Sequence, residues 1–142
     1  MEWAGSSMDN KHGPGSVVLL VEDDQDVREA ISDVLEEEGY VVVSADTGAE
    51  ALAWLRSAEA LPVVILLDLM MPVMDGWQFR AEQERKPEWA SIPVIVLSAI
   101  GNTRERAESI RPFGCLRKPL DIDELLEMLA KLQPSAEQRV SV

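Results

Sequence analysis

Short apolar runs alternate along the chain with segments of helical periodicity. Runs rich in β-branched residues predict strands at residues 17–21, 40–44, 63–67, 94–97 and, more weakly, 113–116. These runs are apolar at nearly every position rather than at every second one, which is typical of strands buried on both faces.

The segments between these runs carry the signals of helices. Val27, Ile31 and Leu35 fall on one helical face, and Gly39 marks the end of that helix. A capping residue followed three positions later by Glu or Gln recurs four times, at Thr47 with Glu50, Asp75 with Gln78, Asn102 with Glu105, and Asp121 with Glu124. The resulting order βαβαβαβαβα predicts an α/β fold, in which a parallel sheet carries helices on both faces.

Composition excludes several classes of function. The 142 residues suit one domain, and the net charge of −13 argues against binding nucleic acid or an anionic membrane surface. Cys115 is the only cysteine, which excludes an intrachain disulfide and a cysteine-rich zinc site. The only histidine, His12, lies outside the predicted elements, so a Ser-His-Asp or Cys-His catalytic unit is not expected. No apolar run reaches the length of a membrane span, and we expect a cytoplasmic protein.

The predicted domain covers residues 16–133. Residues 1–15 have no periodicity and are interpreted as a flexible leader, for which an expression tag is one origin. Residues 134–142 follow the last predicted helix and are interpreted as a tail.

Polar side chains follow four of the predicted strands. They are Glu22 and Asp23 after the first strand, Asp68 after the third, Ser98 after the fourth, and Lys118 with Pro119 after the fifth. The carboxyl ends of parallel strands meet at one edge of the sheet, where open α/β proteins bind their ligands, so we expect these side chains to lie close together. Asp68 closes a five-residue apolar run, where a charge without a partner is costly.

Three carboxylates at one edge repel one another unless a cation lies among them. Their oxygens, completed by water, suit Mg²⁺, for which Mn²⁺ can substitute, and Lys118 adds a further positive charge. A carboxylate beside a divalent cation and a lysine can accept a phosphoryl group. The cations neutralise charge on the transferring oxygens while the carboxylate attacks in line.

The chain resembles the response-regulator receiver domain of two-component signalling. The resemblance covers roughly residues 16–133 and rests on Glu22-Asp23, Asp68 with the following Leu69-Met70-Met71-Pro72, Ser98-Ala99 and Lys118-Pro119, in that order and each at a strand end. It implies a flavodoxin-like (βα)5 fold with the sheet order 2-1-3-4-5.

The resemblance also implies the roles of the acidic residues. Asp68 would be the phosphoacceptor. Asp23 would bind Mg²⁺ directly and Glu22 through water, and the backbone carbonyl of Met70 would complete the metal ligands supplied by the protein. 

Further roles follow from the resemblance for the ends of the fourth and fifth strands. Ser98 would contact the phosphoryl group and help to switch the fold. Lys118 would contact a phosphoryl oxygen, and its bond to Pro119 would be cis.

Three positions depart from the usual family pattern. Cys115 stands where receivers often have a Tyr or Phe that takes part in switching, so that aromatic ring is missing. Met70 and Ile100 occupy the two positions that flank the attacking water in the family, and both are apolar. Because neither can orient a water molecule, we expect a slowly hydrolysing acyl phosphate.

We therefore expect a phosphorylation-dependent signalling switch rather than an enzyme. This switch would assist its own phosphorylation and dephosphorylation. The donor would be a sensor histidine kinase or a phosphotransfer protein. A downstream protein would bind the face from Asn102 to Leu132, and the chain would be a monomer or weak dimer. 

Two alternatives remain open at the level of sequence. One is a receiver-like docking module that is never phosphorylated. The other is a Mg²⁺-dependent phosphohydrolase of the haloacid-dehalogenase type, which needs a second Asp where this chain has Met70.

Overall fold

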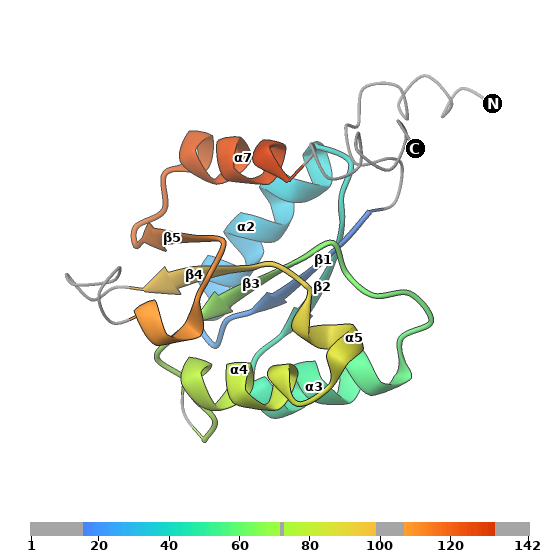
Figure 1. Cartoon of the computed structure of the whole chain (residues 1–142). Helices are drawn as coiled ribbons and strands as arrows, with labels where there is room; N and C mark the ends of the chain where they lie inside the picture. The colour runs from blue at the N-terminus through green and yellow to red at the C-terminus, as the bar shows by residue number, and fades with distance from the viewer. Residues whose placement is uncertain (1–15, 72, 99–106, 133–142) are drawn as a thin grey trace.

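Five parallel strands form one sheet in the order β2-β1-β3-β4-β5, as Figure 1 shows. The computed structural model describes residues 16–71, 73–98 and 107–132. The strands are β1 (Val17–Val21), β2 (Val41–Ala45), β3 (Val64–Asp68), β4 (Val94–Ser98) and β5 (Gly114–Arg117). The predicted parallel sheet and its 2-1-3-4-5 order are both confirmed.

Two strands extend further toward the carboxyl edge than their apolar runs suggest. Asp68 is the last residue of β3 and lies in register with Leu97, and Ser98 is the last residue of β4 and lies in register with Arg117. The ladder of a parallel sheet continues through a polar residue as long as its backbone groups are paired. Both polar residues are therefore fixed by the sheet itself and not by a loop.

Helices cover both faces of the sheet (Figure 1). Helices α2 (Gln25–Glu37) and α7 (Ile122–Lys131) lie on one face, and α3 (Gly48–Ser57), α4 (Gly76–Glu84) and the short α5 (Pro87–Ala90) lie on the other. A single 3₁₀ turn, η1 (Glu108–Ile110), precedes β5. Alternate strand residues divide the core in two, since Leu19 and Ile65 pack with α3 and α4, while Leu20 and Leu66 pack with α2 and α7.

Helices α3, α4 and α7 begin after the predicted capping residues Thr47, Asp75 and Asp121, but their capping hydrogen bonds differ in detail. Asp75 and Gln78 form a complete capping box on α4. At α3, Thr47 Oγ1 accepts the hydrogen bond from Glu50 N, but Glu50 Oε1 accepts from Asp46 N, one residue before the cap. Glu50 therefore holds the end of β2 as well as the start of α3.

Helix α5 has no counterpart in the sequence prediction. It is four residues long, which is too short to show a helical period, and it starts with Pro87 in the first turn. The buried amide of Gln83 donates to the carbonyl oxygens of Trp89 (2.7 Å) and Ile92 (3.2 Å), so a tertiary contact holds this turn against α4.

Several sequence predictions lie outside the described residues: the leader at 1–15, the tail at 134–142, the Asn102 cap and Ile100. Within the described parts of the chain, no helix has the length and apolar character needed to cross a membrane.

Candidate functional site

Three carboxylates meet at the carboxyl edge of the sheet. Glu22 and Asp23 follow β1, and Asp68 ends the neighbouring strand β3, so the pairing of these two strands brings the three side chains together. One oxygen from each lies within 4.8 Å of the others. Glu22 is 0% exposed and Asp68 is 3% exposed, whereas Asp23 faces solvent. The cluster is therefore open to solvent on the side of Asp23.

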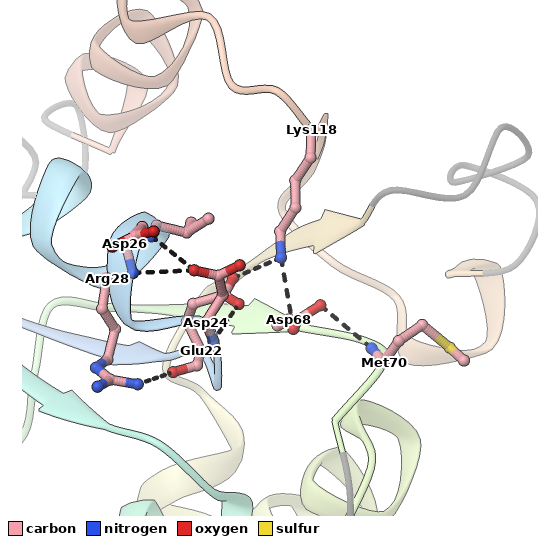
Figure 2. Close-up of polar contacts among 8 residues, drawn as sticks. Glu22, Asp24, Asp26, Arg28, Asp68, Met70 and Lys118 are labelled. Atoms are coloured by element: carbon pink, nitrogen blue, oxygen red, sulfur yellow. Dashed lines mark hydrogen bonds and ion pairs between the residues drawn. The ribbon is translucent and has the colours of Figure 1, made fainter.

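Lys118 links two of these carboxylates. Figure 2 shows its amine between Glu22 and Asp68, with Nζ 2.7 Å from Glu22 Oε1 and 3.5 Å from Asp68 Oδ2. The lysine reaches the cluster because β5 pairs with β4, and Lys118 N donates to Ser98 O at 2.9 Å. The peptide bond between Lys118 and Pro119 is cis.

Backbone N–H groups hold the carboxylates of Glu22 and Asp68 in position. Glu22 Oε2 accepts a hydrogen bond from Asp24 N at 3.0 Å, and Asp68 Oδ1 accepts one from Met70 N at 3.2 Å. Arg28 Nη1, one turn into α2, donates to the carbonyl oxygen of Glu22 at 2.9 Å (Figure 2). The role of Arg28 was not predicted from the sequence, although a basic residue one turn into the helix after the acidic pair was an available signal.

Burial and like charge control the protonation of Asp68. Removal from water and the nearby Glu22 charge raise its pKa to about 7, against the opposing effect of Lys118. Burial by itself lowers the pKa of Lys118, but its hydrogen bond to Glu22 and the charges of Asp68 and Glu22 outweigh this effect and raise it. One lysine therefore does not neutralise the cluster.

The donor set fits a divalent cation. The site offers three carboxylates, which are hard oxygen ligands of the kind that Mg²⁺ prefers. Glu22 Oε1 is buried, and the amine of Lys118 at 2.7 Å is the one cation paired with it among the described residues. An additional cation would relieve the repulsion that raises the pKa of Asp68.

The structure places the remaining predicted residues at different distances from this cluster. Ser98 is fully buried at the end of β4, next to β5, the strand that Lys118 follows. The Met70 side chain is 52% exposed beside Asp68. Cys115 is half-buried within β5, in register with Val96, and packs against the α3–α4 side of the core. Ile100 lies outside the described residues.

A glycine lets the loop after Asp68 turn tightly into α4. Gly76 N donates to Leu69 O at 2.9 Å, and a Cβ atom at Gly76 would lie 2.9 Å from Leu69 Cα. The same loop holds Val73 at φ 71°, a left-handed conformation that β-branched residues rarely adopt. The turn that leads to the predicted helix cap at Asp75 thus also sets the position of α4 against the acidic cluster.

Comparisons with known proteins agree with this geometry. The family model described as the response regulator receiver domain matches residues 18–130. The response regulator Rre1 of Synechocystis sp. is 37% identical over 128 residues, which cover 84% of this chain and 54% of Rre1. The sensor histidine kinase TmoS of Ectopseudomonas mendocina is 39% identical over 119 residues, which cover 81% of this chain and 12% of TmoS.

A solved structure shows the same fold. The chemotaxis protein CheY4 of Vibrio cholerae superposes with a TM-score of 0.75 at 29% identity, covering 83% of this chain and 98% of that chain. The chain spans about half the length of Rre1, with 54% of that relative matched. Receiver domains are signalling modules of two-component systems that interact with sensor histidine kinases. By its sequence and its fold, the chain belongs to the response regulator receiver domain family.

Proposed function

We propose that the chain is a phosphorylation-dependent switch whose acceptor is Asp68 and whose phosphoryl donor is a sensor histidine kinase or a phosphotransfer protein. The observation that carries this proposal is the cluster of three carboxylates within 4.8 Å, two of them in contact with Lys118. In a receiver domain, such a cluster supplies a nucleophile and the charges that stabilise a transferring phosphoryl group.

We assign the nucleophilic attack to the carboxylate of Asp68. An oxygen of its side chain forms the new bond to phosphorus as the bond between phosphorus and the donor's imidazole nitrogen breaks, and the imidazole leaves with the electron pair. The transfer requires the ionised carboxylate. Because the pKa of Asp68 is raised to about 7, a bound cation would increase the ionised fraction near neutral pH. Lys118 contributes here and also faces the oxygens of an incoming phosphoryl group.

Members of this family bind Mg²⁺, and the donor set described above fits this ion. Asp23 and Asp68 would bind it directly, Glu22 through water, and the backbone carbonyl of Met70 would complete the set. When bound, the ion neutralises charge on the phosphoryl oxygens. Ser98, buried at the end of β4, would donate to the loaded acceptor and so report its state to the segment that follows.

The lifetime of the acyl phosphate depends on access of water to Asp68. Met70 is exposed beside Asp68, and its side chain offers no useful hydrogen bond to water. Together with Ile100, it leaves no polar group at the two positions that would orient the attacking water. The expected result is a slowly decaying state, which suits a sustained output.

An apolar hollow beside Lys118 supports docking of the phosphoryl donor. It measures about 380 Å³ and lies between α2 and the start of α7, where Val27, Ile31, Pro119 and Leu120 line it. A donor helix that packed here would bring its phosphorylated side chain to the neighbouring acceptor, because Lys118 lines the hollow and contacts Asp68 as well.

We assign signal output, the binding of a downstream protein, to the face from Asn102 to Leu132. The structure describes residues 107–132 of this face. A second hollow of about 440 Å³ lies on this face, between η1, β5 and α7. It contains the half-exposed Phe113 and, beside it, Cys115 in place of the family's usual aromatic ring. We expect weaker coupling between acceptor and output than such a ring would give. Hydrogen exchange that is the same in this face with and without a phosphoryl mimic would contradict the assignment.

Both alternatives are disfavoured by specific residues. A docking module that is never phosphorylated has no need of a buried acidic cluster with a paired lysine. A phosphohydrolase of the haloacid-dehalogenase type needs an acidic side chain where Met70 stands.

The direct test is phosphorylation by a small phosphodonor. The intact protein is incubated with acetyl phosphate and Mg²⁺, and its mass is measured. We expect the addition of one phosphoryl group, which disappears in Asp68→Asn and in the presence of a chelator. Asp75→Asn is the matched control, since it alters an exposed helix cap at the same edge and keeps a side chain that can cap α4. Undiminished labelling of Asp68→Asn would refute the site.

A further inference from the structure

A buried arginine ties helix α4 to the segment before β5. Arg80 is 8% exposed, and its Nε donates to the carbonyl oxygen of Ile110 at 3.0 Å. Glu84, one turn further along α4, has Oε2 3.5 Å from Arg80 Nε and 2.6 Å from Arg111 Nη2. We call Arg80, Glu84 and Arg111 the clasp, because together they join two elements that are 30 residues apart in the sequence.

The closed clasp carries two costs. Arg80 Nη1 is buried without a hydrogen-bond partner among the described residues. Arg111 has a left-handed backbone, with φ 54° and ψ 58°, at the end of η1. An incompletely paired buried guanidinium and a left-handed non-glycine residue both favour release. Three polar contacts oppose these costs, so the net stabilisation of the closed arrangement is smaller than those contacts alone would give.

The opposite end of α4 is fixed to the acceptor. Gly76, the first residue of the helix, donates to the carbonyl oxygen of Leu69, which directly follows Asp68. The contact is too close for any side chain at Gly76, so we expect a movement of the acceptor strand end to shift the start of the helix. A helix transmits such a movement along its axis, and here the far end carries the clasp.

The segment held by the clasp borders the proposed output hollow. Glu108 and Arg111 line the hollow of about 440 Å³ with Phe113. Directly after the clasp, Phe113 N donates to Val94 O at 2.7 Å, where the pairing of the fifth strand begins. Opening of the clasp would therefore release one wall of the hollow while the sheet stayed paired.

We propose that the clasp couples the acceptor to the 107–113 wall of this hollow through α4, so that loading of Asp68 and closure of the clasp change each other's free energy. This inference rests on the proposed role of Asp68, but it adds a route that does not pass through Ser98. The three clasp residues act at a distance and are positioning residues. Because thermodynamic coupling between two sites is reciprocal, removal of the clasp must change the affinity of the acceptor site for its ligand.

The test combines two measurements on the full chain: the affinity for beryllofluoride with Mg²⁺, and hydrogen exchange in residues 107–113 with and without that phosphoryl mimic. Glu84→Gln removes the shared carboxylate. Arg111→Gly removes one cation without backbone strain, because glycine adopts φ 54° readily. Glu82→Gln is the matched control, since it breaks an exposed ion pair with Arg85 (3.4 Å) at the same end of α4.

In the wild type and in Glu82→Gln, the mimic should change exchange in 107–113 by about tenfold. In the two clasp variants this change should fall below about twofold, and the affinity should shift by about fivefold or more. Wild-type values of both quantities in the clasp variants would overturn the coupling, even if those variants were less stable, and leave the proposed function intact. A wild-type protein that does not bind the mimic would instead overturn the proposed function, and the coupling with it.

Discussion

Replacing Asp68 by Asn should stabilise the metal-free protein at pH 8 far more than at pH 5. Folding raises the pKa of this carboxyl from its usual 3.8 to about 7, chiefly through burial and the charge of Glu22. The folded protein therefore holds the proton more tightly than the unfolded chain. The stability that this proton contributes is fully present below pH 3.8 and is lost as the pH rises to about 7.

The size of the effect follows from the same two values. A difference of 7 − 3.8 = 3.2 pK units would correspond to roughly 4 kcal/mol, of which more than half is lost between pH 5 and pH 8. Lys118 loses one of its two carboxylate partners in the variant, and the amide must itself be desolvated. These costs are similar at both pH values. The free energy of unfolding of Asp68→Asn relative to wild type should therefore still rise by about 1–3 kcal/mol from pH 5 to pH 8.

Urea denaturation in a chelating buffer at the two pH values measures this difference. At the midpoint of thermal unfolding it corresponds to roughly 3–10 °C for a domain of this size. The variant Asp75→Asn, at an exposed cap of the same edge, is the control. If the stability difference between Asp68→Asn and wild type were the same at pH 5 and pH 8, the reasoning about the buried, charged cluster would be refuted.

Three further predictions concern the same edge of the sheet. Mg²⁺ should raise the melting temperature, because it binds the folded cluster and not the unfolded chain. In a thermal scan, Asp23→Ala should lose most of this gain, and an undiminished gain would place the ion elsewhere. Val73→Gly should stabilise the protein by about 1 kcal/mol in chemical denaturation, since the valine is 90% exposed and held at φ 71°; a loss of stability would contradict the strain argument. The double variant Met70→Asn with Ile100→Glu should lose its phosphoryl group about ten- to hundredfold faster than wild type, when the decay of purified phosphoprotein is timed separately from loading. An unchanged decay rate would show that apolar shielding does not set the lifetime.

Local sequence patterns were sufficient to predict the sheet and the position of its polar edge. Apolar runs without alternation indicate strands covered on both faces, and strands that alternate with helices must be parallel. Once the strands are parallel, residues that follow them meet at one edge, which is why Glu22, Asp68 and Lys118 could be placed together. The short helix α5 could not be predicted, because its four residues depend on the Gln83 amide for support.

The energetics of the site and the clasp were decided only by tertiary structure. Sequence order does not reveal that Glu22 is completely buried or that Lys118 Nζ approaches it to 2.7 Å, and these facts govern the charge of Asp68. Nor does any periodicity relate Arg80 to Ile110, because their hydrogen bond joins separate elements across 30 residues. Periodicity records which face of an element is apolar. Burial, distance and partner choice depend on which elements finally pack together, and that is a property of the whole fold.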